Sequence, residues 1–488
     1  MSFFKDLHIV WQILIVFFTF NTIIALYTVF HRPRSIASVF AWMFALIFIP
    51  GIGFLLYLFA GRGIDREIIK KYANQQNDQI AEINARIESQ NQQLKGNIVP
   101  NGEGLLKNFL KNHEETLLTK GNQVEVITDG KEKFSRMFRD IEQAKETIHV
   151  EYYAIFNDKI GNAFLNLLVK KAQEGVQVRV IFDPFGGNVR LKFFKPLSDS
   201  GGQVLPFITA HKFIRKTRLN YHLHRKIVII DGKISWTGGF NVGDQYLTLT
   251  KKFGFWRDTH FRIVGMASYG FQEIFLRDWN VSALDPSQRL SYDLDYFKFI
   301  EPSQESAVSI HVVGDGPEDD AQTLKGSFIK MLLGAKKRVW FQTPYLIPDD
   351  SMIEAILMAV QSGIDVRIMI PCMPDHPFIY RATQYYANFL HQHGVKIYIY
   401  HGGFLHAKVV LMDDMLSSFG TMNQDIRSYA LNFEVNAFAY SEPLNRQLTQ
   451  IFEADVEQSI LLTDAMIEQQ PRSLRFKQSF ARLMSPIL

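Results

Sequence analysis

One eighteen-residue pattern occurs twice in this chain and limits the folds it can adopt. Each copy holds a histidine, a lysine, an aspartate, a glycine and an asparagine at the same relative positions, and the copies lie 182 positions apart. The first copy comprises His224, Lys226, Asp231, Gly238 and Asn241, and the second comprises His406, Lys408, Asp413, Gly420 and Asn423. Packing periodicity repeats apolar character and does not require a particular imidazole or ammonium group. The repeat therefore predicts two equivalent units that share one chemical task.

The sequence around the two copies predicts a duplicated α/β fold. In the first half, two segments rich in β-branched and aromatic residues (147–154 and 176–182) flank a helix-like segment (160–173). The second half repeats this order at 339–345, 352–361 and 365–370. The Glu301-Pro302-Ser303 segment marks a boundary between the halves. We therefore predict a first domain over 122–302 and a second over 303–488.

The N-terminal sequence predicts a transmembrane hairpin over residues 1–61. Two apolar runs, 9–30 and 36–60, each exceed the ~20 residues with which a helix crosses a bilayer. A cleaved signal peptide is the alternative for the first run, but no small-residue cleavage site follows it and a second run comes at once. Basic residues favour the outer ends (Lys5, Arg62, Arg66, Lys70, Lys71) over the loop between the runs (Arg32, Arg34). This bias predicts a cell-membrane protein with two spans and the rest of the chain in the cytoplasm.

Residues 62–121 are polar and predict a helical spacer and linker. Apolar residues at helical spacing occur at Ile80, Ile83, Ile87 and Leu94. These positions fit the seam of a short coiled coil, which would make the chain a homo-oligomer. Gln76 and Gln90 fall on the same seam and favour a solvated helix instead. At the other end of the chain, residues 472–488 mix basic and apolar residues and predict an amphipathic tail. The tail could lie at a membrane interface or pack on the protein's own core.

Composition narrows the possible partners. Lysine and arginine together number 53 against 49 acidic residues, so the net charge of +4 suits an anionic surface. No extended basic stripe is present, and we therefore predict no nucleic-acid partner. The single cysteine, Cys372, excludes an intramolecular disulfide and any multi-cysteine metal site. Because the lysines of the two patterns would repel a cation, we predict no metal there, and no other cofactor is expected.

The residue types of the repeated pattern suit metal-free chemistry on a phosphodiester. Such a reaction needs a nucleophile, positive charge on the phosphate oxygens and an acid for the leaving group. Imidazole can be the neutral nucleophile in one copy and the protonated acid in the other. The histidine and lysine of each copy are two residues apart, so on a strand they point to the same face. Asp231 and Asp413 follow the apolar run at a turn, where aspartates more often fix the backbone than take part in chemistry.

Both copies resemble the HKD signature of the phospholipase D superfamily, His-x-Lys-x4-Asp followed by x6-Gly-x-x-Asn. The flanking sequence is similar to that of bacterial cardiolipin synthases over almost the whole chain. The similar segments are 34–35, 41–42, 50–54, 58–62, 256–260, 404–408, 423–428, 431–435 and 482–486. The resemblance implies a duplicated phospholipase D-type α/β/α sandwich with one pseudo-twofold active site. Two positions depart from it: Gly239 stands where many relatives have serine, and His222 where they often have arginine.

The resemblance also implies a reaction and a role for each residue. One histidine would attack phosphatidylglycerol, release glycerol and hold the phosphatidyl group, which a second phosphatidylglycerol would accept to give cardiolipin. By analogy His224 is the nucleophile and His406 the acid and base, although sequence symmetry leaves the reverse open. The implied catalytic set is His224, Lys226, Asp231, His406, Lys408 and Asp413, and the implied substrate-binding set is Asn241, Asn423, Gly239 and Thr421. The histidine-orienting acids would be Asp258, 34 residues after His224, and Glu434, 28 residues after His406.

Three other functions are alternatives at this point. A membrane-anchored phospholipase D would use the same residues with water as acceptor and make phosphatidic acid. A nuclease is the second alternative, against which the two apolar runs and the modest charge argue. A membrane scaffold without activity is the third, and it would leave two intact catalytic patterns without a role. The predicted partners of the transferase are phosphatidylglycerol and anionic membrane lipids.

Overall fold

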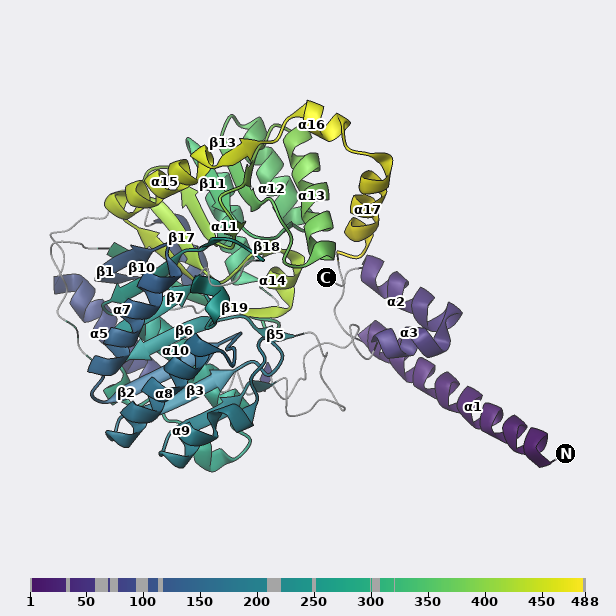
Figure 1. The fold of residues 1–488 in the computed structure, drawn as a ribbon, viewed down its shortest axis with the longest axis horizontal. Helices are drawn as coiled ribbons and strands as arrows, with labels where there is room; N and C mark the ends of the chain where they lie inside the picture. The colour runs from purple at the N-terminus through teal and green to yellow at the C-terminus, as the bar shows by residue number, and fades with distance from the viewer. Residues whose placement is uncertain are drawn as a thin grey trace. The chain divides into compact units, whose positions relative to one another are not determined.

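Figure 1 shows the computed structural model of the chain, which describes residues 2–31, 36–57, 69–70, 78–93, 104–112, 117–208, 221–247, 252–298, 300, 308–319 and 321–485. The chain divides into two compact units. The smaller, N-terminal unit comprises Met1–Ile69 with Lys212–Tyr221, and the larger unit comprises Lys70–His211 and His222–Leu488. Both copies of the repeated pattern therefore lie in the larger unit.

The N-terminal unit contains helices α1 (Ser2–His31), α2 (Ile36–Phe48) and α3 (Pro50–Leu56). Within the predicted second span, 36–60, the helix is broken between α2 and α3, and residues 58–60 lie outside the described residues. Pro50 disfavours helical backbone at Ile49, where φ is −132° and ψ is 59°. Helix α3 turns back so closely against α2 that a Cβ atom on Gly53 would lie 2.1 Å from the carbonyl oxygen of Ala45. Among the described residues, no helix has both the length and the hydropathy required to cross a membrane.

The larger unit is built from two halves with matching element order (Figure 1). The first half contains β1 (Thr119–Ile127), α7 (Gly130–Gln143), β2 (Thr147–Tyr152), α8 (Lys159–Gln173), β3 (Gln177–Phe182), α9 (Lys195–Asp199), β4 (Gln203–Pro206), β6 (Lys226–Ile230), β7 (Ile234–Gly238), β9 (His260–Val264) and α10 (Ser268–Ser282). The second half contains β10 (Val308–Asp315), α11 (Thr323–Gly334), β11 (Arg338–Gln342), α12 (Asp350–Gln361), β13 (Asp365–Pro371), α13 (Pro377–Gln392), β14 (Lys396–Tyr400), β16 (Val409–Met412), β17 (Leu416–Gly420), β19 (Asn432–Tyr440), α15 (Glu442–Glu457), β20 (Ser459–Leu461), α16 (Asp464–Glu468) and α17 (Arg472–Leu483).

Shorter elements complete the two halves. The short strands are β5 (His222–Leu223), β8 (Trp256–Arg257), β12 (Leu346–Ile347), β15 (Phe404–Leu405) and β18 (Gln424–Asp425), and α14 spans Ile426–Ala430. Single 3₁₀ turns cover Leu191–Phe194, Asp244–Leu247, Pro286–Gln288 and Leu294–Tyr296.

One mixed sheet of 16 strands joins the two halves. The strands of the first half follow one another from one edge of the sheet in the order β4-β3-β2-β6-β7-β9-β1. At the other edge lies β20, and next to it the strands of the second half follow in the order β14-β13-β11-β16-β17-β19-β10. The parallel pairs occur at the same places in both orders, between β2, β3 and β4 and between β11, β13 and β14. The halves meet where β1 and β10 pair antiparallel. These equivalent strands confirm the predicted duplicated α/β fold. The predicted boundary at 301–303 lies outside the described residues.

Helices pack on the sheet and begin at side-chain caps. Asp129, Asp158, Asp349 and Ser441 accept backbone N–H bonds at the starts of α7, α8, α12 and α15. The apolar faces of α7 and α8 pack on β2 and β3 in one core, and those of α11, α12 and α13 pack on β11 and β13 in another. Each copy of the repeated pattern is therefore held by its own rigid core.

Helices α5 (Asp78–Gln93) and α6 (Gly104–Asn112) correct the prediction of a solvated spacer. Ile83, Ile87 and Gln90 are buried, and Gln90 Nε2 donates 3.1 Å to a backbone carbonyl near the end of the first half. Two leucines of α6 lie in the core of the second half. The predicted coiled-coil seam therefore packs on the protein's own larger unit. The outer seam positions, Gln76 and Leu94, lie outside the described residues.

Candidate active site

Each motif histidine lies where a short strand of one half pairs with the other half. β5 runs parallel to the start of β19, and β15 runs parallel to β8. The backbone N–H of His224 donates to the carbonyl oxygen of Phe433 at 2.9 Å, and the backbone N–H of His406 donates to that of Arg257 at 2.7 Å. The residues after these two carbonyls are Glu434 and Asp258. This strand pairing therefore places each histidine next to an acidic residue of the opposite half.

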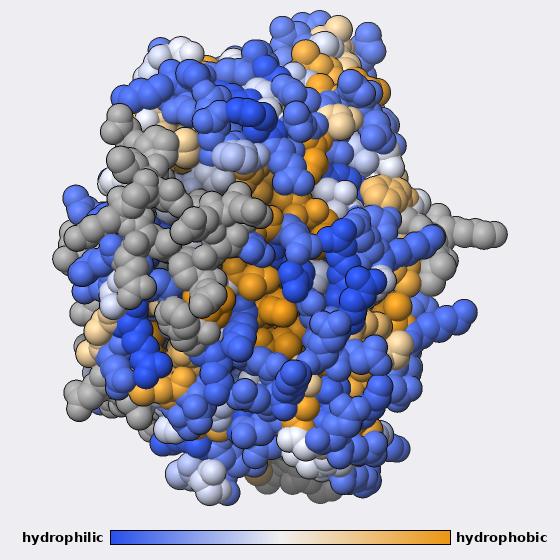
Figure 2. Space-filling view, turned by 90° about the vertical axis from the view of Figure 1, so that its left-hand side faces the viewer, coloured by the Kyte–Doolittle hydropathy of each residue, from blue (hydrophilic) through white to orange (hydrophobic). Residues whose placement is uncertain are grey.

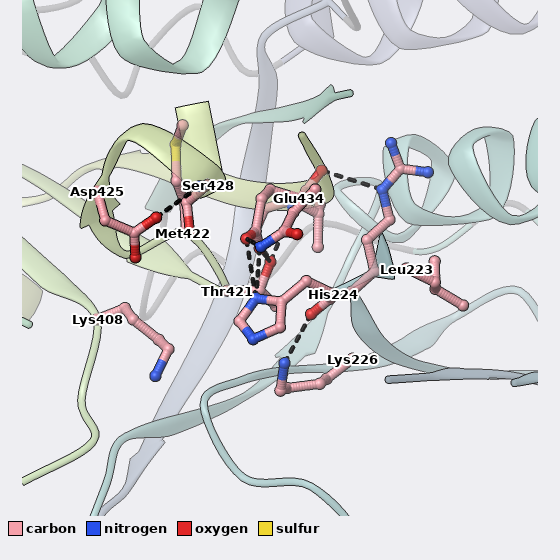
Figure 3. A network of polar contacts seen from close by, with 12 residues as sticks. Leu223, His224, Lys226, Lys408, Thr421, Met422, Asp425, Ser428 and Glu434 are labelled. Atoms are coloured by element: carbon pink, nitrogen blue, oxygen red, sulfur yellow. Dashed lines mark hydrogen bonds and ion pairs between the residues drawn. The ribbon is translucent and has the colours of Figure 1, made fainter. Parts of the chain in front are cut away.

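The orienting acids cross between the halves, which corrects the prediction that each serves the histidine of its own half. His224 Nδ1 lies 2.8 and 2.9 Å from the two carboxylate oxygens of Glu434 (Figure 3). His406 Nδ1 lies 2.7 Å from Asp258 Oδ2. Because a carboxylate accepts, each Nδ1 carries the proton and each Nε2 is left for the reaction. A single half would hold a histidine without its acid, so the site needs both.

Gly239 and Thr421 occupy equivalent positions and contact the two acids. The Thr421 hydroxyl donates 2.6 Å to Glu434 Oε2. A Cβ atom on Gly239 would lie 2.0 Å from Asp258 Oδ1, which instead accepts the backbone N–H of Thr259 at 2.7 Å. Thr421 therefore bonds the carboxylate of Glu434, and the absence of a side chain at Gly239 leaves room for that of Asp258.

The two lysines lie beside the histidines on the same strand face. Lys226 Nζ donates to the carbonyl oxygen of His224, and Lys408 Nζ donates to that of His406, both at 2.6 Å. Figure 3 shows Lys226 and Lys408 on either side of His224 and Glu434. All four histidine and lysine side chains are buried or nearly so. The site therefore gathers two cations that have little water to solvate them.

Burial sets the protonation of these groups. Burial lowers the pKa of His224 to about 4, against the attraction of Glu434, and burial and Lys408 lower the pKa of His406. Burial also lowers the pKa of Lys226 to about 7 and that of Lys408 to about 8. Burial alone would raise the pKa of Glu434, but His224 and Lys226 outweigh it and the pKa is lowered. In the empty site at neutral pH, both imidazoles are neutral, and an anion would stabilise the lysines in their charged form.

The lysines predict that the KM for an anionic phosphodiester substrate rises with pH. A lysine is charged below its pKa, so Lys226 and then Lys408 lose their charge in the empty site as the pH passes about 7 and about 8. Each loss should raise KM up to about tenfold per pH unit above that pKa. Steady-state kinetics between about pH 6 and 9 would measure KM. Lys226→Arg is the control: because arginine stays charged over this range, the variant should not show the rise in KM near pH 7. A KM that does not vary with pH in the wild type would contradict the prediction.

Asn241 and Asn423, the last residues of the two copies of the pattern, are both buried. Asn241 Nδ2 donates to the Tyr246 hydroxyl at 2.9 Å, and its Oδ1 accepts the backbone N–H of Ala154 at 3.3 Å. Asn423 is buried, and its Oδ1 has no partner within the described part of the chain. Both amides follow the strands that end at Gly238 and Gly420, as the repeat predicts.

Asp231 and Asp413 lie at the far ends of β6 and β16 from the histidines. Both have left-handed backbone, with φ of 50° and 48°. The Asp231 carboxylate accepts three successive N–H groups at the start of β2, at 2.8 to 3.2 Å, and Asp413 does the same at the start of β11. Their inclusion in the catalytic set is therefore corrected: they fix the strand ends, as aspartates at turns commonly do.

Replacing Asp231 by alanine should lower stability without altering the chemistry. The change removes the acceptor of three N–H groups and puts alanine in left-handed backbone, which together should cost about 2 to 4 kcal/mol of unfolding free energy. Thermal unfolding in detergent would measure the loss, and KM should stay at the wild-type value. Asp231→Asn, which tolerates the backbone and keeps one acceptor oxygen, should lose less. A fall in kcat with unchanged stability would contradict this role.

Three residues near the site were not predicted from the sequence. The Tyr153 ring lies 5.0 Å from that of His224, and Lys226 Nζ lies 5.5 Å from its centre. Arg225 donates from Nε to the carbonyl oxygen of Glu434 at 3.0 Å and forms an ion pair with Asp278. Arg257 forms a two-pronged bond with Asp455, at 2.9 and 2.6 Å. Their only sequence signal is adjacency: the arginines stand next to His224 and Asp258, and Tyr153 follows a buried strand.

Comparison with known proteins places this site in a family. A family model described as "Cardiolipin synthase, PLD-like domain" matches residues 137–279 and 328–456, and one described as "Phospholipase D-nuclease N-terminal" matches 21–62. The chain is 40% identical over 483 residues to a cardiolipin synthase of Listeria welshimeri, covering 98% of this chain and 99% of the relative. It is 40% identical over 481 residues to the major cardiolipin synthase of Bacillus subtilis, with the same coverage. The crystal structure of phosphatidylserine synthase from Haemophilus influenzae matches with a TM-score of 0.56 at 16% identity, over 75% of this chain and 94% of that one, which supports the fold alone.

Proposed function

The chain belongs to the cardiolipin synthases of the phospholipase D superfamily, and from this premise we propose that it converts two phosphatidylglycerol molecules into cardiolipin and glycerol. The observation that supports the chemistry is the pair of neutral histidines, each held through Nδ1 by an acid of the opposite half and each beside a lysine. The two Nε2 atoms can act on the two faces of one phosphorus centre.

In the first step, His224 Nε2 attacks the phosphorus of phosphatidylglycerol. The P–N bond forms and the bond from phosphorus to the glycerol headgroup oxygen breaks. His406 supplies the proton that the departing glycerol takes up; the bound phosphate and Asp258 stabilise its protonated form. Lys226 and Lys408 stabilise the charge on the non-bridging oxygens.

In the second step, the phosphatidyl group moves to a second phosphatidylglycerol. Neutral His406 takes the proton from the headgroup hydroxyl, whose oxygen forms the new bond to phosphorus. The bond to His224 Nε2 breaks and the free imidazole returns. Atoms balance: two phosphatidylglycerol molecules become one cardiolipin and one glycerol, and no cofactor is consumed.

Product analysis tests this function. The full-length protein would be reconstituted in vesicles with phosphatidylglycerol, and glycerol, cardiolipin and phosphatidic acid would be measured together. Equal amounts of glycerol and cardiolipin are expected. Phosphatidic acid as the main product would instead establish the hydrolytic alternative, a membrane-anchored phospholipase D.

We further propose that the N-terminal unit attaches the protein to the cell membrane. Its helices expose many large apolar side chains, among them Trp11, Phe17, Phe20, Phe44 and Phe48. Such a surface is rare in water and common in contact with lipid. The two-pass topology with a cytoplasmic larger unit is part of this proposal. It is based on basic residues of which five, Arg32, Arg34, Arg62, Arg66 and Lys71, lie outside the described residues.

Cysteine labelling in intact cells tests the topology. With Cys372 replaced by serine, a cysteine at Gln450, on α15 of the larger unit, should react with a membrane-impermeant maleimide only after the membrane is opened. Ser35→Cys, between the two apolar runs, should react from outside. Labelling of Gln450→Cys in intact cells would contradict the orientation.

A further inference from the structure

The last helix, α17, packs on the larger unit through one narrow face. Gln478 and Ala481 are buried, and the Gln478 side chain lies 3.4 Å from Asn388 Nδ2 on α13. Arg475 donates from Nη2 to the carbonyl oxygens of Ile467 and Glu468, at 3.1 and 2.7 Å. Figure 1 shows α17 beside α13. The helix is therefore held in place by small and polar contacts.

The large apolar side chains of α17 are mostly exposed to either side of this contact. Phe476 and Leu483 are each 72% exposed and Phe480 is 50% exposed. Their spacing of four and three residues places them in one stripe along the helix. The helix also carries four basic residues and no acidic one; the basic residues are Arg472, Arg475, Lys477 and Arg482. An exposed apolar stripe with basic flanks is typical of helices that lie in a membrane interface.

The stripe continues toward the active site. The Phe480 ring lies 6.1 Å from that of Phe378, which is itself 38% exposed and stands three residues after Asp375. Asp375 accepts the hydroxyl of Tyr345, and Tyr345 precedes β12, which pairs with β18 directly after Asn423. The segment from Asp375 to Phe378, at the start of α13, therefore contacts both the apolar stripe and Tyr345.

The first half exposes an apolar residue in the loop that follows β3, the strand equivalent to β13. Phe185, after β3, is 44% exposed, and its ring lies 6.2 Å from that of His222. Asp183 in the same loop accepts the backbone N–H of Leu223 at 2.9 Å, directly before His224. Each half thus exposes a phenylalanine shortly after one of two equivalent strands, β3 and β13. Figure 2 shows the left-hand side of Figure 1, where hydrophilic residues surround a band of hydrophobic residues that runs through the centre of the view.

We propose that Phe185, Phe378 and the stripe of α17, together the docking surface, seat the larger unit on a membrane rich in anionic phospholipid. The apolar side chains enter the boundary between headgroups and acyl chains, and the basic residues of α17 contact lipid phosphates. The rim of the active site then lies at the level of the headgroups, so that a lipid phosphate reaches the histidines while its acyl chains stay in the bilayer. This docking adds to the attachment by the N-terminal unit and does not depend on which reaction the site performs.

Fluorescence quenching in vesicles tests the contact with lipid. The full-length chain with Cys372→Ser would carry an environment-sensitive fluorophore on Leu483→Cys or Phe476→Cys, with Gln450→Cys on the exposed surface of α15 as the matched control. Vesicles of phosphatidylglycerol and phosphatidylcholine with brominated acyl chains should quench about half or more of the signal at 476 and 483, since such helices insert by ~5–10 Å, and should leave 450 unquenched. Vesicles without anionic lipid should quench less.

Two results would overturn the docking surface. The first is that positions 476 and 483 are as accessible to aqueous iodide as position 450, which would leave the stripe in water. The second is that both are shielded from iodide and from brominated lipid, which would mean that protein covers the stripe. Quenching as expected in a protein that makes no cardiolipin would refute the proposed function and leave the docking surface intact.

Kinetics provide an independent test. Replacing Phe476, Phe480 and Leu483 together by serine should raise KM for phosphatidylglycerol in vesicles about tenfold and leave kcat/KM for a short-chain, water-soluble phosphatidylglycerol unchanged. Neutralising Arg472 and Lys477 to glutamine, which removes no apolar contact, should raise KM in phosphatidylglycerol vesicles at low salt and have a smaller effect at high salt. Equal losses on the soluble and the vesicle substrate would contradict the proposal.

Discussion

Replacing His224 by alanine should reduce cardiolipin formation by at least ~10⁴-fold, because the reaction loses the atom that bonds to phosphorus. The same loss is expected for His406→Ala with phosphatidylglycerol, whose glycerol leaves poorly without a proton. Turnover of phosphatidylglycerol therefore cannot tell the two histidines apart. The distinction needs a substrate whose leaving group requires no acid.

Phosphatidyl-p-nitrophenol supplies such a leaving group. With this substrate, His406→Ala should release a burst of p-nitrophenolate equal to the enzyme concentration and retain the phosphatidyl group on His224, whereas His224→Ala should give no burst. Mass spectrometry of the peptide that contains residue 224 would identify the adduct. Matching thermal unfolding of both variants would exclude misfolding. A burst in His224→Ala with the adduct on His406 would reverse the assignment.

The repeated pattern carried most of what could be predicted about the fold. Identical spacing of His224 and His406 in their copies requires equivalent strands, and β6 and β16 occupy equivalent places in the sheet. The pattern also placed each histidine and lysine on one strand face, because strand periodicity is local. What spacing could not supply was the partner of each acid. The pairing of β5 with β19 and of β15 with β8 joins residues about 150 to 210 positions apart, and such a register depends on how the halves meet.

Hydropathy alone also did not predict the break in the second apolar run or the packing of α5. The run 36–60 is apolar throughout, but Pro50 breaks the helix and Gly53 lets α3 lie against α2. The seam of α5 has the spacing of a coiled coil, yet the nearest apolar surface is the chain's own sheet, since α5 contacts β1. Periodicity identifies an apolar face and does not identify what covers it.

The crossed acids give the second large effect. Glu434→Gln removes the charge that holds the Nδ1 proton of His224, and Asp258→Asn does the same for His406. Each change should lower cardiolipin formation about 10³-fold, because the imidazole loses its fixed tautomer and the stabilisation of its charged form. Steady-state rates in vesicles would measure the loss of activity, and thermal unfolding of the purified variants would show that they are folded. Thr421→Val is a milder control, because it removes only a hydroxyl bonded to Glu434. We expect it to lower the rate about tenfold or less.

Phosphatidyl-p-nitrophenol again separates the two positions, and here it distinguishes crossed acids from acids that serve their own half. If Glu434 orients His224, Glu434→Gln should slow the burst by about as much as it slows cardiolipin formation. Asp258→Asn should keep a fast burst, because the acid that it impairs is not needed for this leaving group, and should slow only the later transfer to the acceptor. The opposite result, a fast burst in Glu434→Gln and a slow one in Asp258→Asn, would mean that each acid serves the histidine of its own half or that His406 is the nucleophile. The adduct position from the alanine variants decides between these two, so the experiments together determine both the nucleophile and its acid.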